Sequence, residues 1–335
     1  MPGPPVLGKR LLWVTISLAG LLCAVMVLSI SMGSAEIGAG KALRSLFGLQ
    51  ESDPALASIL WQIRLPRVLL AALLGATLSM GGLVFQALLR NPLAEPYILG
   101  ISGGAAIGAI IGILMGFSRF PGVGLLAFAG SMATLLVVLL MSSGKTVMKQ
   151  DALLLSGVMV NAFCSAVIMF LVSITQDARL HNILFWLMGD LSMTDLGQVG
   201  ILGLSILPCF VVIFWLSNDM NLLLMGREMA HTMGVNTRLV SFLLLTVTSF
   251  MVSATVSYCG LVGFVGLVMP HLLRLLLGPD HRVLVPACTL GGAAYMMVCD
   301  LLARVLPEQG EMPAGVVTAL IGAPLFIYLL RRTRR

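Results

Sequence analysis

The stretch that decides the fold runs from Leu239 to Leu273 and reads LVSFLLLTVTSFMVSATVSYCGLVGFVGLVMPHLL, 35 consecutive residues without Asp, Glu, Lys or Arg. A helix needs about 20 apolar residues to cross the hydrocarbon core of a bilayer, so this run is too long for a single crossing. Gly260 and Pro270 interrupt it, and both residue types weaken or end helices. The run therefore predicts two membrane helices, a full one and a shorter one that ends near Gly278.

The rest of the chain has the same membrane character. Of its 335 residues, 59% are hydrophobic and 10% are charged, and the mean hydropathy is +1.03, whereas soluble domains carry roughly 25% charged residues. The first apolar run, residues 11–32, follows two basic residues and has no convincing cleavage site. It is longer than the apolar core of a signal peptide, about 7–15 residues, and so predicts a retained first span.

Charged residues and Gly/Pro breaks divide the remaining chain into further uncharged runs. With the long run counted twice, we predict ten transmembrane helices in one transmembrane domain, residues 1–335, and an all-α polytopic fold. Six single cysteines lie in apolar stretches without any CxxC pair, which predicts neither a disulfide frame nor a metal site. The uncharged runs lie near 11–32, 68–89, 96–118, 120–144, 152–176, 196–218, 239–273, 283–299 and 312–330.

Basic residues indicate which side of the membrane each loop faces. With an even number of spans both termini share a side, and placing them in the cytoplasm puts thirteen of the twenty Lys and Arg residues inside and seven outside. This bias, and the C-terminal RRTRR cluster above all, follows the positive-inside rule. The net charge of +6 is spread over membrane flanks, so it predicts a topology and no nucleic-acid partner.

Two long loops have different characters. The first, about 33–63, is predicted to be external, and the second, about 217–238, cytoplasmic. The second contains MGREMAHTMGV, from Met225 to Val235, a short helix-like stretch that Gly234 is placed to stop. Such a helix outside the bilayer is either a solvated loop or a segment that inserts into a partner's groove. Neither loop leaves room for a nucleotide-binding domain.

Two short motifs suggest other functions only weakly. Lys145 lies in a Gly-Lys-Thr sequence, but the glycine and strand that a phosphate-binding loop needs before it are missing. Ser102 lies in a G-x-S-G pattern typical of intramembrane serine proteases, which also need a membrane histidine as base. Only His271 falls near a helix end, and the small residues after Ser102 suit tight helix packing. The protease stays a remote alternative.

Charges close to membrane depth are functional hypotheses by default. Arg64 and Arg67 flank Pro66 at the predicted outer head of the second span, and Asp300 and Arg304 stand four residues apart near the outer end of the ninth. The last two could pair on one helix face. The arginines are either snorkelling interface anchors or a docking surface for an acidic protein.

Across essentially its whole length the sequence resembles the permease subunits of the iron-chelate and cobalamin branch of ATP-binding-cassette (ABC) importers, the FecCD-like family. Several distinct blocks in the family's order carry the resemblance. They are WQIRLPR at 61–67, NPLAEPYILGISGG at 91–104, GFVGLVMPHLLRLLLGPDHR at 263–282 and MPAGVVTALIGAPLFIYLL at 312–330.

The resemblance implies the architecture and partners of a type II ABC importer permease. It implies a homodimer of ten-helix subunits in the bacterial inner membrane, with both termini inside. Two cytoplasmic ATP-binding subunits would attach on one side, and a periplasmic substrate-binding protein would dock on the other. The chain itself would be a transport subunit and not an enzyme, without a cofactor or metal site of its own.

The resemblance also implies roles for particular residues. Outward arginines pair with acids of the binding protein, a coupling helix sits in the ATPase groove, and two segments form a cytoplasmic gate. The second gate segment departs here from the small hydroxyl residues of the cobalamin permeases. The matching positions are Arg64, Arg67 and Arg304 for docking; Gly226, Arg227, Glu228, Ala230 and Gly234 for coupling; and Asn91, Leu93, Gln150 and Asp151 for the gate.

The predicted function is the ATP-driven import of a bulky metal chelate, an iron–siderophore, haem or a related compound, from periplasm to cytoplasm. A cobalamin or corrinoid permease of the same architecture is the alternative. A secondary transporter would need an ion-coupling site, and the sequence has no acidic cluster at mid-span.

Overall fold

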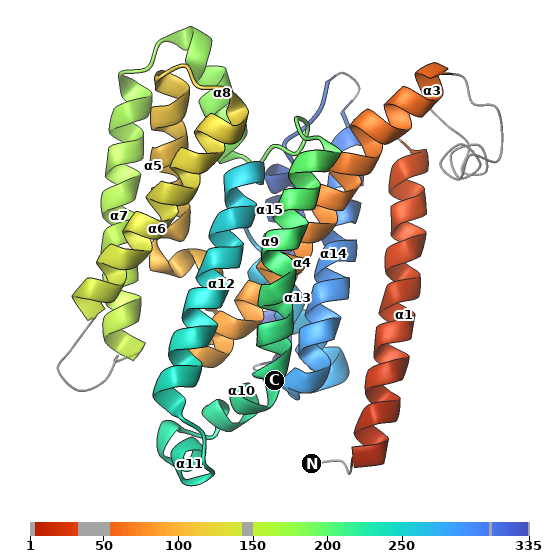
Figure 1. The fold of residues 1–335 in the computed structure, drawn as a ribbon, viewed down its shortest axis with the longest axis vertical. Coiled ribbons are helices and arrows are strands. Elements are labelled where there is room, and N and C mark those ends of the chain that lie inside the picture. The colour runs from red at the N-terminus through yellow and green to blue at the C-terminus, as the bar shows by residue number, and fades with distance from the viewer. Residues whose placement is uncertain (1–3, 33–53, 143–149, 308–309, 334–335) are drawn as a thin grey trace. The chain divides into compact units, whose positions relative to one another are not determined.

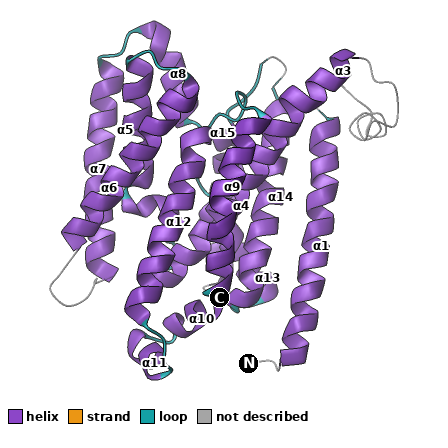
Figure 2. Cartoon of the chain, in the orientation of Figure 1, coloured by secondary structure: helices purple, strands orange, loops and turns teal. Residues whose placement is uncertain are grey.

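The computed structural model describes residues 4–32, 54–142, 150–307 and 310–333. Across these ranges all regular secondary structure is helical, and no strand occurs (Figure 2). Because lipid offers no hydrogen bonds to an unpaired backbone, helices that satisfy their own N–H and C=O groups are the expected solution for so apolar a chain.

The ten predicted spans are confirmed as apolar helices. Seven described helices are long and apolar enough to cross a membrane, and three shorter apolar helices accompany them. The long ones are α1 (Pro4–Ser31), α4 (Leu65–Leu89), α6 (Gly124–Ser142), α7 (Gln150–Ser173), α9 (Leu196–Trp215), α12 (Thr237–Cys259) and α14 (His281–Val305); the shorter ones are α5 (Ile101–Leu114), α13 (Val265–Leu277) and α15 (Ala314–Thr333).

Short helices fill several of the connections. They are α3 (Pro54–Ser58), the π-helix η1 (Ile59–Arg64), the 3₁₀-helix η2 (Pro96–Leu99), the π-helix η3 (Arg119–Val123), α8 (Asp177–Leu187), α10 (Ser217–Leu224) and α11 (Arg227–Thr232). The sequence predicted the stretch around α11 but not α8, because α8 carries Asp177, Arg179 and His181 and was assigned to a loop.

The chain divides into two compact units that are interleaved in sequence. Unit 1 comprises Met1–Met80, Asp190–Ser205 and Gly263–Arg335, and unit 2 comprises Gly81–Gly189 and Ile206–Val262. Helices α4 and α9 each contribute to both units. Since neither unit is one continuous stretch of chain, the single permease domain over 1–335 stays a prediction.

Close helix crossings through glycine hold each unit together. In unit 1, a Cβ atom on Gly75 of α4 would overlap the carbonyl oxygen of Gly292 in α14. In unit 2, a Cβ atom on Gly104 of α5 would overlap the carbonyl oxygen of Gly130 in α6, and α5, α6 and α7 lie side by side (Figure 1). Small residues let membrane helices approach closely, as predicted for the stretch that follows Ser102.

The second span begins earlier than predicted. The sequence placed its start near residue 68, after Arg64 and Arg67, but helix runs without a break from Pro54 to Leu89. Pro66 lacks a backbone N–H and crowds the turn before it. The π-helix η1 absorbs this proline, with the Leu65 N–H donating to the Leu60 carbonyl five residues earlier. The two arginines lie inside the helix because other elements engage them: carboxylates pair with Arg67, and carbonyl groups accept hydrogen bonds from Arg64.

Candidate docking, coupling and gate sites

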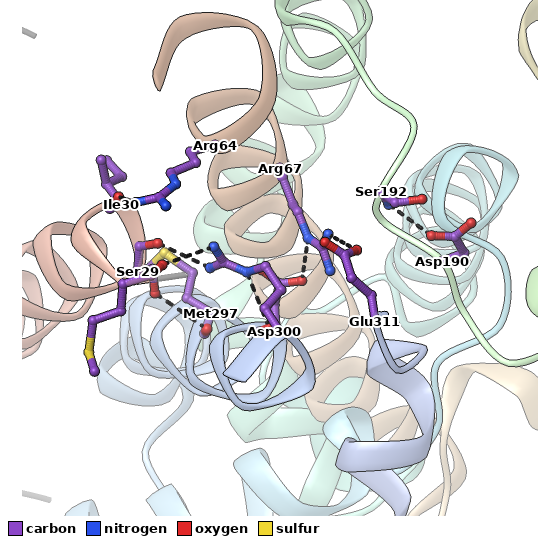
Figure 3. Close-up of polar contacts among 11 residues, drawn as sticks. Ser29, Ile30, Arg64, Arg67, Asp190, Ser192, Met297, Asp300 and Glu311 are labelled. Atoms are coloured by element: carbon purple, nitrogen blue, oxygen red, sulfur yellow. Dashed lines mark hydrogen bonds and ion pairs between the residues drawn. The ribbon is translucent and has the colours of Figure 1, made fainter. Parts of the chain in front are cut away.

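Arg67 lies at the start of α4 between two carboxylates of unit 1 (Figure 3). Its Nε donates to Oδ1 of Asp300 on α14 at 2.8 Å. Its Nη1 pairs with Oε2 of Glu311, which lies in the connection between α14 and α15. The Asp300 side chain is 1% exposed, whereas that of Glu311 is 49% exposed. One partner of Arg67 is therefore sealed in the protein and the other faces outward.

Asp300 is shared with a second arginine. Arg304 follows it by one turn of α14, and the Arg304 Nε lies 3.1 Å from the Asp300 Oδ2. This confirms the pair predicted from their spacing. A buried carboxylate is costly unless it is paired, and two flanking guanidinium groups meet that need.

Arg64 and Arg304 both donate to the C-terminal end of α1. The Arg64 Nη1 lies 2.7 Å from the Ile30 carbonyl oxygen and 3.1 Å from that of Ser31. The Arg304 Nη2 lies 3.1 Å from the Ser29 carbonyl oxygen. The last carbonyls of a helix have no partner within it, and positive charge is favourable there. Because α1 has no basic residue in its own last turn, two other helices supply this cap.

We call Arg64, Arg67, Arg304, Asp300 and Glu311 the arginine cluster. The structure brings the three predicted docking arginines to one end of unit 1, but each is buried and already engaged. Docking through them stays a prediction, and it requires an exchange of partners. The sequence did not single out Glu311, because its arginine lies 244 residues away along the chain.

The predicted coupling segment is a short helix with a glycine at each end. Helix α11 begins after Gly226, whose φ is 118°, and stops at Gly234, whose φ is 87°. The Val235 N–H donates to the Ala230 carbonyl at 3.0 Å, and the Gly234 N–H to the His231 carbonyl at 3.0 Å. These two hydrogen bonds, together with a glycine in the left-handed conformation, form the Schellman motif, which confirms that Gly234 ends the helix.

The exposed surface of this segment is apolar as well as charged. Ala230 is fully buried, whereas Glu228 is exposed. Met225, Met229 and Met233 are more than half exposed, although they lie between the membrane helices α9 and α12. The side chain of Arg227 lies outside the described part of the structure. Flexible methionine side chains suit a surface that adapts to a partner.

The two predicted gate segments both lie in unit 2. Asn91 accepts a hydrogen bond from the Leu93 N–H at 2.9 Å, which holds a tight turn after α4, and Leu93 is exposed. Helix α7 begins at Gln150, with Asp151 exposed in its first turn. Among the described side chains, no hydrogen bond or ion pair joins Asn91 or Leu93 to Asp151. Their role as a gate stays a prediction.

A half-buried polar pair that the sequence did not single out follows the first gate segment. The Tyr97 hydroxyl accepts a hydrogen bond from the Val262 N–H at 3.2 Å, which ties η2 to the end of the α12 connection within unit 2. Glu95 precedes it at the N-cap of η2. Burial raises the pKa of the Glu95 carboxyl above its ordinary value, and burial likewise raises the pKa of Tyr97.

These features define a multi-span helical membrane protein, and comparison with known proteins gives its class. The chain matches the FecCD transport family over residues 21–332. It is 38% identical over 317 residues to the hemin transport system permease protein HmuU of Yersinia pestis, covering 92% of this chain and 94% of that protein. It is also 38% identical over 322 residues to the vitamin B12 import system permease protein BtuC of Salmonella arizonae, covering 96% and 94%.

A solved structure supports the same fold. A metal-chelate type ABC transporter in an inward-facing conformation superposes with a TM-score of 0.85 at 32% identity, covering 95% of this chain and 99% of that one. The chain belongs to the FecCD transport family. It is the membrane-spanning permease subunit of a bacterial ABC importer and not an enzyme, so the serine-protease alternative is wrong.

Proposed function

We propose that this permease imports a bulky metal chelate, with haem, an iron–siderophore and a corrinoid as the three candidate cargoes. The observation that carries the proposal is the near-complete coverage, at the same 38% identity, of a hemin permease and a vitamin B12 permease. Both cargoes are large compounds in which a macrocycle holds a metal ion, and the similar solved structure is also of metal-chelate type.

The chelate would travel as a whole, with its metal held by its own ligands. In the described part of the chain, no three His, Cys, Asp or Glu side chains lie close enough together to hold a metal ion. We therefore expect the permease to discriminate by size and weak surface contacts, and its binding protein to supply most of the specificity.

An ABC importer permease works with an ATPase and a binding protein, and we propose a homodimer with two ATP-binding subunits. Helix α11 is the proposed contact with the ATPase. Ala230 anchors the helix by burial, while Met229, Met233 and Glu228 remain exposed for a partner's groove. A short helix fixed at both ends can transmit movement of the ATPase as a rigid link.

The arginine cluster is the proposed contact with the substrate-binding protein. Among the described side chains, the arginine cluster holds three guanidinium groups beside two carboxylates, an arrangement that suits acidic groups on a docking protein. The segments around Asn91 and Asp151 are the proposed cytoplasmic gate.

Uptake by cells tests the proposal directly. Cells would co-express this chain with the ATPase and the binding protein encoded beside it, and receive labelled haem, iron–siderophore and cobalamin in parallel. We expect accumulation of one of these chelates, lost when Arg64 and Arg67 are both reversed to Glu. A complex that is stable in the membrane but accumulates none of the three would contradict the chelate assignment.

A further inference from the structure

We propose that Glu311 is an internal substitute for a carboxylate of the binding protein, and that docking displaces it from Arg67. The inference rests on the proposed docking role of the arginine cluster. It adds a residue that would set the affinity of that contact.

Of the contacts described for the three arginines, the one between Arg67 and Glu311 is the most open to exchange. Arg64 and Arg304 are engaged by the carbonyl groups at the end of α1, and Arg304 also by Asp300. Releasing either would leave orphan carbonyls at a helix end. Arg67 instead has one bond to a sealed carboxylate and one to a carboxylate that is half exposed.

The two partners of Arg67 differ in how easily they can leave. Asp300 is 1% exposed, is shared by two arginines and lies within α14. Glu311 lies on the connection between α14 and α15 and reaches Arg67 from the outer side. An ion pair that remains half in solvent contributes little to stability, so an incoming acid can replace it.

The backbone around Glu311 places it but does not lock it. The next residue, Met312, donates its N–H to the Ala303 carbonyl at 3.1 Å and so ties the connection to the last turn of α14. On the other side, Gly310 has a φ of 75° and nothing within 4 Å of where its Cβ would be. A glycine hinge next to a tethered residue allows the Glu311 side chain to swing away while the helices stay fixed.

Charge is conserved by the exchange. With Glu311 in place, Arg67 and Arg304 are balanced by two carboxylates; without it, one positive charge is left in a largely buried site. A carboxylate from the binding protein restores the balance. Arg67 thus has a carboxylate partner both before and after docking. The apparent affinity of docking is lowered only in proportion to the fraction of time that Glu311 occupies Arg67.

The test compares binding-protein affinity in four permease variants, each assembled with the ATPase in lipid nanodiscs. Glu311→Gln removes the competing charge and keeps the side-chain shape. If Glu311 occupies Arg67 for most of the time, we expect docking to tighten by about threefold to tenfold. Asp195→Asn is the matched control, because it removes one exposed carboxylate of unit 1 that caps α9 through the Gln198 N–H, a role that Asn retains.

The double variant Arg67→Gln with Glu311→Gln, compared with Arg67→Gln alone, identifies the residue through which Glu311 acts. The tightening should vanish when Arg67 is absent. If Arg67→Gln weakens docking but Glu311→Gln leaves it unchanged or weakens it, the substitution idea is overturned and the docking surface stands. If neither arginine nor glutamate matters, both the docking role and the inference fail.

Discussion

At the residue scale, the decisive group is the buried carboxylate of Asp300. It lies between the guanidinium groups of Arg67 and Arg304 and is 1% exposed. Each arginine has another partner of its own, but Asp300 has no described partners except these two charges. The carboxylate therefore keeps two positive groups together at the end of unit 1.

Neutralising Asp300 should destabilise the protein strongly. In Asp300→Asn the two guanidinium groups would face each other without the charge between them, and breaking a buried ion pair costs about 3–5 kcal/mol. The measurement is the thermal unfolding of the purified permease in detergent. Asp195→Asn, an exposed change of the same kind, should leave the midpoint unchanged; equal midpoints for both variants would contradict the role of Asp300.

Glu95 should give the protein a pH-dependent stability. Because burial raises the folded-state pKa of Glu95 above the unfolded one, ionisation opposes folding, and stability falls as the pH rises through the folded value. Glu95→Gln should thus raise the unfolding midpoint near about pH 8 and have little effect below about pH 4, where the carboxyl is protonated in both states. A difference that grows towards acid pH would contradict this sign.

At the element scale, α11 depends on the glycine that ends it. Gly234 has a φ of 87°, and an alanine there costs about 1–2 kcal/mol. Gly234→Ala should fray the helix end and separate ATP hydrolysis from transport, so that uptake falls several-fold while basal hydrolysis persists. Disrupting Glu228 should act in the same direction.

The control for this variant is Gly116→Ala. Gly116 follows α5 with a φ of 79° and, like Gly234, has nothing within 4 Å of its missing side chain. It therefore carries the same backbone strain at another helix end. Equal loss of coupling in both variants, or none in Gly234→Ala, would remove α11 from the link to the ATPase.

Element by element, the sequence predicted more of the fold than of the site. Apolar runs and helix-ending glycines are local signals in the sequence. All ten spans and the end of α11 at Gly234 could therefore be predicted. The start of the second span was missed because Pro66 and its flanking arginines mark a helix end unless distant groups engage them. For Arg67 these groups are Asp300 and Glu311, which lie 233 and 244 residues away, and no local pattern reports such pairing.

At the scale of the whole molecule, the orientation in the membrane remains to be tested. The even number of spans puts both termini on one side, and the bias of Lys and Arg, above all at the basic C-terminus, predicts that this side is the cytoplasm. In Figure 1 the start of α1 and the end of α15 lie towards the same end of unit 1, as an even number of crossings requires.

Cysteine labelling in intact cells checks this orientation. Ser192 precedes α9 on the predicted outer side and Met229 lies on α11 on the inner side, and both are exposed. A membrane-impermeant maleimide should label Ser192→Cys from outside and reach Met229→Cys only after the cells are opened. The unmodified chain serves as the background, and the reverse pattern would invert the topology.

The arginine cap on α1 has a consequence for how the protein is made. Helix α1 leaves the ribosome well before α14, because one of the two side chains that satisfy its final carbonyls, Arg304, is synthesised 275 residues after the Ser29 that it binds. Until then α1 holds only the partial cap from Arg64. Helix α1 therefore enters the membrane before its C-terminal cap is complete. In a nascent chain stalled before α14, α1 would be held less firmly against its neighbours.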